Sequence, residues 1–87
     1  MKEKVLIVIA MQKDFVDGAL GFPGAEKLDG KIAAKIREYG PGRVIFTRDT
    51  HFENYLDTRE ARNLPVVHCI QGTKGWECYG ETAKALA

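Results

Sequence analysis

The stretch VLIVIA, residues 5–10, decides the fold class of this chain. It lies in a continuous apolar run rich in valine and isoleucine, with no alternation of polar and apolar residues. Such a run is typical of a β-strand that is covered on both faces, as in a parallel sheet. We therefore expect a strand over residues 4–10. The polar and aromatic segment that follows, MQKDF at residues 11–15, predicts a loop at the carboxyl end of this strand.

A loop and a helix are expected next along the chain. Residues 16–24 (VDGALGFPG) hold three glycines and a proline, which predict a loop. Residues 25–39 predict a helix, because their apolar side chains recur at steps of three and four. The apolar stripe consists of Ala25, Leu28, Ile32, Ile36 and Tyr39. The sequence GPG at residues 40–42 ends this helix, since glycine favours a helix C-terminus and proline cannot continue the helix.

Two further strands are expected, over residues 43–47 (RVIFT) and 65–70 (PVVHCI). Residues 48–63 between them are polar and have no clear periodicity, and residues 81–87 (ETAKALA) predict the start of another helix. This order predicts an α/β fold with a parallel, Rossmann-like sheet flanked by helices. We expect a single domain over residues 1–87.

Composition and charge exclude several classes of protein. The chain has 87 residues, of which 45% are hydrophobic and 29% charged, and its net charge is +1. This balance gives no electrostatic reason to expect binding to nucleic acid or to an anionic membrane. No apolar run approaches the roughly 18 residues that a membrane span needs, and the start of the chain lacks the features of a signal peptide. We therefore expect a cytoplasmic protein whose two cysteines are free thiols.

Polar side chains follow the second and third expected strands where each strand ends. Asp49 and His51 lie two residues apart, so an extended backbone projects them to the same side. His68 lies at the end of the third strand. Because the carboxyl ends of parallel strands share one edge of a sheet, we expect these three side chains to converge. One carboxylate and two imidazoles suit zinc, iron or manganese, with positions left for water or substrate.

The same residues also fit a purely structural interpretation. An Asp-Thr-His sequence after a strand often forms a solvated turn in which the aspartate accepts hydrogen bonds from backbone amides. His68 could likewise be a hydrogen-bonded histidine of the core, and the spacing alone leaves both interpretations open. Cys69 is expected to point away from His68, to the other face of its strand, as a core thiol.

The end of the first strand carries a residue without polar chemistry. Ala10 stands where a carboxylate would face the same crevice, and its methyl group can only pack. Phe15 lies near the mouth of that crevice. Its ring provides either a stacking surface for a substrate or a plug that closes the loop onto the sheet.

Three segments together resemble the isochorismatase-like cysteine hydrolases, a family that includes nicotinamidases. Residues 5–15 (VLIVIAMQKDF) are similar to the opening of the family, and residues 47–51 (TRDTH) look like its metal loop. Residues 68–75 (HCIQGTKG) look like its His-Cys-x-x-Gly-Thr-x-Gly segment. The three segments occur in the family's order and cover essentially the whole chain, which corresponds to about the N-terminal half of a family domain.

The resemblance implies amide hydrolysis by an Asp–Lys–Cys triad, in which the cysteine attacks the carbonyl and the aspartate takes the thiol proton. It also implies that Asp49, His51 and His68 bind a divalent metal, with zinc expected and iron or manganese as alternatives. The family's aspartate falls on Ala10, which cannot accept a proton. The resemblance also implies that the family's lysine and nucleophilic cysteine lie further along the family fold than Ala87.

Two hypotheses from different classes follow. In the first, the chain is the N-terminal portion of a metal-dependent, nicotinamidase-like amidohydrolase for a small amide, inactive as written. In the second, it is a non-catalytic α/β pseudoenzyme or assembly module. An incomplete sheet exposes an unpaired strand edge and an uncovered apolar face. We therefore expect association with the remaining C-terminal half of the domain, or a homo-oligomer.

Overall fold

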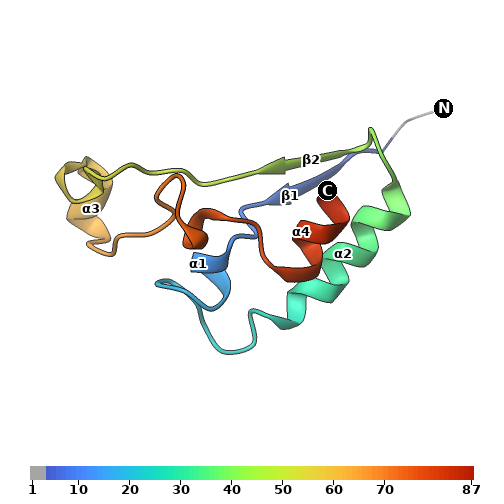
Figure 1. The fold of residues 1–87 in the computed structure, drawn as a ribbon, viewed down its shortest axis with the longest axis horizontal. Coiled ribbons are helices and arrows are strands. Elements are labelled where there is room, and N and C mark those ends of the chain that lie inside the picture. Colours follow the sequence, from blue (N-terminus) through green and yellow to red (C-terminus); the bar gives the residue numbers. More distant parts are fainter. Residues whose placement is uncertain (1–3) are drawn as a thin grey trace.

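The computed structural model describes residues 4–87, so the first three residues of the expected domain lie outside the described part. Two parallel strands lie side by side, and helices pack against one of their faces (Figure 1). The strands are β1 (Leu6–Ile9) and β2 (Val44–Thr47). The helices are α1 (Lys13–Val16), α2 (Lys27–Tyr39), α3 (Arg59–Asn63) and α4 (Gly80–Leu86), with single 3-10 turns η1 (Tyr55–Asp57) and η2 (Lys74–Trp76).

The expected fold class is confirmed. Strand β1 pairs with β2 in parallel, with Leu6 opposite Val44 and Ile9 opposite Thr47. Helix α2 connects the two strands and contacts β1, and α4 packs along α2 (Figure 1). Within residues 4–87, no helix has the length and apolar character that spanning a lipid bilayer requires.

The prediction of a third strand over residues 65–70 is wrong. Over these residues the backbone forms a single parallel bridge, between Ile70 and His51, and no strand. Two local features account for this. Pro65 has no N–H to donate to a ladder, and the φ angle of Cys69 is +50°, which turns the chain out of the extended conformation.

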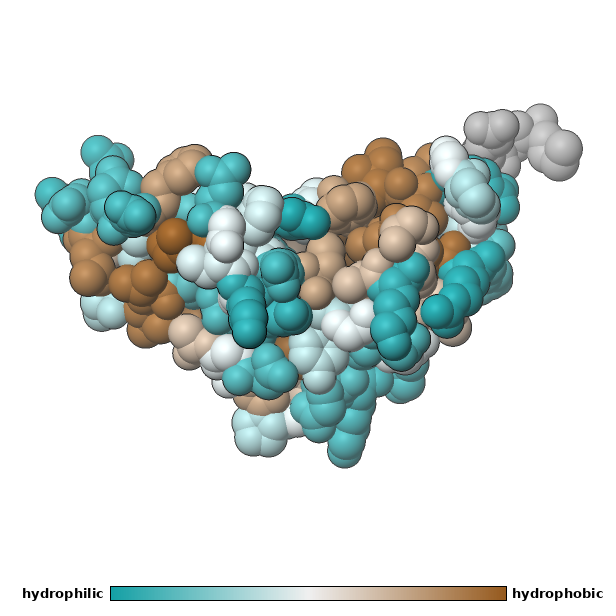
Figure 2. All heavy atoms as spheres, viewed as in Figure 1, coloured by the Kyte–Doolittle hydropathy of each residue, from teal (hydrophilic) through white to brown (hydrophobic). Residues whose placement is uncertain are grey.

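The core lies between the sheet and the helices on one face only. Its buried cluster comprises Val8, Met11, Val16, Ala25 and Ile36. On the other face, Ile7, Ile9 and Ile45 are 58%, 75% and 55% exposed. Hydrophobic atoms accordingly gather at the surface over the strands (Figure 2). The expectation that β1 is covered on both faces is therefore wrong for this chain, because its helices cover only one.

Helix α2 also departs in part from the expected apolar stripe. The helix begins at Lys27, two residues later than expected, and it ends as expected at Gly40, which has a φ of +77°. Leu28 is 48% exposed, however, whereas Asp29 is buried. The Asp29 carboxylate accepts hydrogen bonds from the backbone N–H groups of Glu81 and Thr82, both at 2.8 Å. Asp29 therefore caps the N-terminus of α4 and holds that helix against α2.

The capping interaction also changes the pKa of Asp29. Burial disfavours the charged form, but the hydrogen bonds from the Thr82 and Glu81 N–H groups outweigh it and lower the pKa of Asp29 below the ordinary value of 3.8. A carboxylate whose pKa is lower in the folded than in the unfolded state stabilises the fold above the unfolded pKa. This stabilisation is lost as the pH falls through the folded pKa.

We expect Asp29→Asn to lower the free energy of unfolding at neutral pH by about 1–2 kcal/mol, because asparagine has one acceptor oxygen for two N–H donors. The variant should also lose less stability than the wild-type chain between pH 5 and about pH 2. Urea unfolding across this range measures both effects. Asp17→Asn, which changes an exposed carboxylate, is the control. If Asp29→Asn and the wild-type chain lose the same amount of stability between pH 5 and about pH 2, the capping role of Asp29 is wrong.

Candidate metal centre

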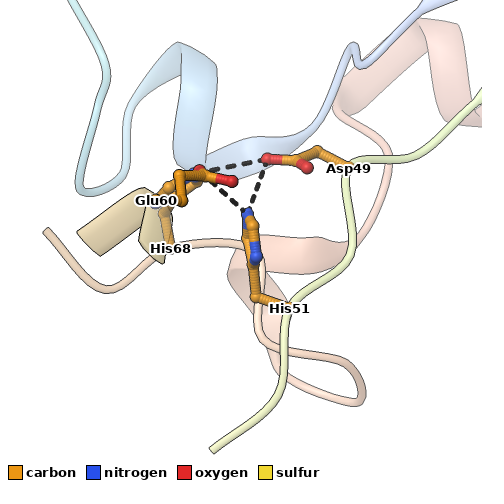
Figure 3. A group of neighbouring side chains, drawn as sticks. All are labelled: Asp49, His51, Glu60 and His68. Atoms are coloured by element: carbon orange, nitrogen blue, oxygen red, sulfur yellow. Dashed lines mark hydrogen bonds and ion pairs between the residues drawn. The ribbon is translucent and has the colours of Figure 1, made fainter. Parts of the chain in front are cut away.

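The chain that leaves β2 carries Asp49 and His51 past the edge where the strands end. Oδ2 of Asp49 lies 3.1 Å from Nε2 of His51 and 3.2 Å from Nε2 of His68 (Figure 3). Backbone hydrogen bonds hold the two segments together: His51 N–H donates to Cys69 O, and Gln71 N–H donates to His51 O, both at 2.9 Å. The structure thus brings the three expected side chains together, through one bridge rather than through neighbouring strands.

His68 is 2% exposed, and its ring is oriented by the backbone. Its Nδ1 lies 2.7 Å from the carbonyl oxygen of Val66, which can only accept a hydrogen bond. Nδ1 therefore carries the proton, and in the neutral ring Nε2 has a lone pair. That lone pair faces carboxylate oxygens, which are also acceptors. Such a contact is repulsive unless a cation, either a proton or a metal ion, lies between the atoms.

Glu60 also belongs to the cluster, although it was not among the residues expected there from the sequence. Its Oε2 lies 3.4 Å from Nε2 of His51 and 3.7 Å from Nε2 of His68. Glu60 stands on α3, whose first turn is capped by Thr58, the side chain of which accepts a hydrogen bond from the Ala61 N–H at 3.4 Å. A threonine before a run of helix-forming residues predicts a short helix at most. The sequence contains no signal that this helix faces the histidines.

The dimensions of the cluster suit a small divalent ion. One donor atom from each of Asp49, His51, Glu60 and His68 lies within 4.8 Å of the other three. A tetrahedral zinc site with bonds of about 2.0–2.2 Å has ligand atoms about 3.3–3.6 Å apart. The carboxylate–imidazole separations of 3.1–3.7 Å fall close to that range. Both carboxylates are partly exposed, so the cluster is open to solvent on their side.

Aromatic rings pack against the two histidines. The centroid of the Tyr55 ring lies 4.7 Å from that of His51 and 5.1 Å from that of His68, both edge to face. Tyr55 is fully buried, and its hydroxyl donates to Leu64 O at 2.7 Å. Burial, and then the nearby Glu60 and Asp49 carboxylates, raises the pKa of Tyr55 above its ordinary value of 10.0, so this donor keeps its proton at neutral pH. The buried Tyr55 ring therefore supports both imidazoles, which also contact each other edge to face at 4.7 Å.

Phe15 and Ala10 lie on the β1 side of the cluster. The Phe15 ring meets the His68 ring edge to face at 5.6 Å, so Phe15 is a neighbour of the candidate ligand. Ala10 directly follows β1, and its N–H donates to Thr47 O at 3.1 Å. The φ angle of Ala10 is +49°, in the left-handed region where alanine is strained and Gly, Asn or Asp is favoured.

Cys69 is a core thiol, as expected, and it is fully buried. Burial, and then the Asp49 and Asp14 carboxylates, raises the pKa of Cys69 to about 12. Since the thiolate is the reactive form, this cysteine is not a nucleophile at neutral pH. Its backbone is left-handed, so the strand alternation that was expected to separate Cys69 from His68 is absent at this position. Cys78 is also a free, partly buried thiol.

These observations define an α/β protein with an incomplete parallel sheet and a candidate cation site at its carboxyl edge. The chain matches the family model of the isochorismatase domain over residues 4–86. The chain therefore belongs to the isochorismatase family, as its sequence motifs led us to expect.

Solved structures of similar fold are about twice as long as this chain. The pyrazinamidase of Pyrococcus horikoshii, solved in complex with zinc, is 40% identical, with a TM-score of 0.73 over 88% of this chain and 45% of its own. A nicotinamidase/pyrazinamidase of Bacillus subtilis is 31% identical, with a TM-score of 0.81 over 95% of this chain and 48% of its own. A search of curated proteins gives no match. The chain thus spans about half the length of the structures it resembles.

We expect Ala10→Gly to raise the free energy of unfolding by up to about 1 kcal/mol, because glycine adopts the left-handed conformation at position 10 without strain. Urea unfolding at neutral pH measures the change. The matched control is Ala34→Gly, at an exposed position in the middle of α2, which should lower stability by about 1 kcal/mol. Equal losses at both positions would show that the Ala10 backbone is not strained.

Proposed function

We propose that this chain is the metal-binding N-terminal portion of a nicotinamidase-like cysteine amidohydrolase that acts on a small amide, and that it does not hydrolyse amides by itself. Membership of the isochorismatase family supports the reaction class. The similarity to a pyrazinamidase in complex with zinc supports zinc as the ion. The proposed ligands are Asp49, His51 and His68. We propose Glu60 as a fourth protein ligand when no substrate is bound.

The observation that carries the proposal is the contact between His68 Nε2 and the Asp49 and Glu60 carboxylates, at 3.2 and 3.7 Å. The hydrogen bond at Nδ1 leaves Nε2 available as a metal ligand, and second partners of this kind are usual for metal-binding histidines. A divalent ion would act there as a Lewis acid that binds and orients a polar group of the substrate. Phe15 would form a wall beside that group, because its ring already contacts His68.

The residues that should carry out hydrolysis are not in this chain. Ala10 has no group that can take a proton from a thiol, so the general base is missing. Cys69, with its pKa of about 12, does not supply the nucleophile. Catalysis would need both the complementary half of the domain and a carboxylate at position 10.

We expect the chain to bind one zinc ion, and zinc at about 100 times its Kd should raise the free energy of unfolding by about 2.7 kcal/mol. His51→Ala and His68→Ala should abolish this stabilisation, because each removes a neutral nitrogen ligand. Calorimetric titration and thermal unfolding measure the two effects. Glu53→Ala, an exposed carboxylate next to the site, is the control and should bind zinc normally.

The zinc-loaded samples should release no ammonia from nicotinamide or pyrazinamide above the rate without protein. Turnover by the chain alone would overturn the proposed inactivity. A wild-type chain that takes up no zinc, cobalt, iron or manganese would overturn the proposed metal centre.

The open face of the sheet supports a second candidate function, a non-catalytic assembly module. Ile7 and Ile45 are opposite each other in the parallel register and share this face with Ile9, and all three are more than half exposed. Exposed apolar patches of this kind mark association surfaces. The occupant would be the remaining half of the domain or a second copy of the chain.

We expect the isolated chain to self-associate at micromolar concentration, and Ile9→Lys to shift it towards monomer, because a charge on the open face opposes burial of that face. Sedimentation velocity measures the distribution of species. Leu56→Lys is the matched control, since Leu56 is 61% exposed but lies in η1, which contacts α3, and not in the strands. A wild-type chain that sediments as a monomer at every concentration would exclude self-assembly.

A further inference from the structure

Gln12 is completely buried, and its side-chain amide is bonded to the backbone of the candidate ligand Asp49 on both sides. Its Oε1 accepts from the Asp49 N–H at 2.8 Å, and its Nε2 donates to Asp49 O at 2.9 Å. Nε2 also donates to Trp76 O at 2.7 Å. Every hydrogen-bonding group of Asp49 outside its carboxylate is therefore held by a single side chain that lies 37 residues away.

These bonds replace a sheet ladder where the sheet has ended. The pairing of β1 with β2 stops at Thr47, so no neighbouring strand restrains the backbone of Asp49. A carboxamide carries a donor and an acceptor side by side, as a peptide group does, and Gln12 supplies both. The backbone held in this way places Oδ2 of Asp49 between the two imidazoles, 3.1 and 3.2 Å from their Nε2 atoms.

The Asp14 carboxylate holds the backbone next to His68 in a similar way. Its Oδ2 accepts a hydrogen bond from the Cys69 N–H at 2.7 Å. Cys69 is the left-handed residue directly after His68, so this bond stabilises the backbone reversal that sends His68 to the cluster and Cys69 to the core. The carboxylate fits because residue 75 is glycine: a Cβ there would lie 2.2 Å from Asp14 Oδ2. Phe15, the next residue, packs on the His68 ring.

We propose that Gln12 and Asp14 are positioning residues of the metal centre, which hold Asp49 and His68 by their backbones without contacting the ion. This inference rests on the metal binding proposed above. Gln12 is the residue at the N-cap position of α1, and Asp14 lies in the first turn of that helix, so one short element supports ligands from two distant segments. Residues that orient metal ligands in this way typically change metal affinity about 10–100-fold when they are replaced.

The test uses Co²⁺ as the probe, with its dissociation constant and its visible absorption spectrum as readouts. We expect Gln12→Met, which keeps the shape but removes the hydrogen bonds, and Asp14→Ala to weaken Co²⁺ binding about 10–100-fold and to alter the spectrum. Asp14→Asn keeps an oxygen that can accept from the Cys69 N–H, and it should restore most of the affinity and the wild-type spectrum.

Asp29→Asn is the matched control, because the Asp29 carboxylate also accepts backbone hydrogen bonds from a distant segment, but it caps α4 and lies outside the cluster. It should lower the melting temperature of the metal-free protein and leave the Co²⁺ dissociation constant and spectrum unchanged. If Gln12→Met does not fold, the comparison of Asp14→Ala with Asp14→Asn still decides the matter.

The outcomes separate this inference from the proposed function. A wild-type chain that binds no Co²⁺ would overturn the metal centre and this inference together. If the wild-type chain binds Co²⁺ and the Gln12 and Asp14 variants lose melting temperature only, with unchanged affinity and spectrum, the positioning role is wrong and the metal centre stands.

Discussion

Two imidazole nitrogens and two carboxylate oxygens meet within 4.8 Å of one another, and the arrangement of the surrounding chain depends on this contact. Because the Val66 carbonyl holds the proton of His68 on Nδ1, the Nε2 atom of His68 faces the two carboxylates with a lone pair. A cation in their midst turns a repulsive cluster into an attractive one.

The cluster is built from segments that have no regular ladder between them. Asp49 and His51 lie beyond the end of β2, Glu60 lies on the five-residue helix α3, and His68 lies in chain that forms only one bridge. Their alignment comes from side chains that act on backbone groups. Gln12 and Asp14 act in this way from the start of α1, and the Tyr55 ring packs edge to face against both imidazoles.

The opposite end of the molecule is a more ordinary α/β arrangement that is incomplete. Helices α2 and α4 cover one face of the β1–β2 pair, and the Asp29 cap fixes their contact. Ile7, Ile9 and Ile45 remain exposed on the other face. Strands rich in valine and isoleucine are usually covered on both faces in parallel sheets, which agrees with a chain that spans about half the length of the nicotinamidase structures it resembles.

The sequence by itself determined the features that depend on neighbouring residues: the apolar run of β1, the end of α2 at Gly40 and the family motifs. It also predicted that Asp49, His51 and His68 would lie together, although the third strand from which the place of His68 was argued does not form. Only the tertiary structure decided the partners of Glu60, the burial of Asp29 and the bonds of Gln12. Each of these depends on contacts between segments far apart in the chain, as in the 55 residues that separate Asp14 from Cys69. Local periodicity carries no information about how such segments dock.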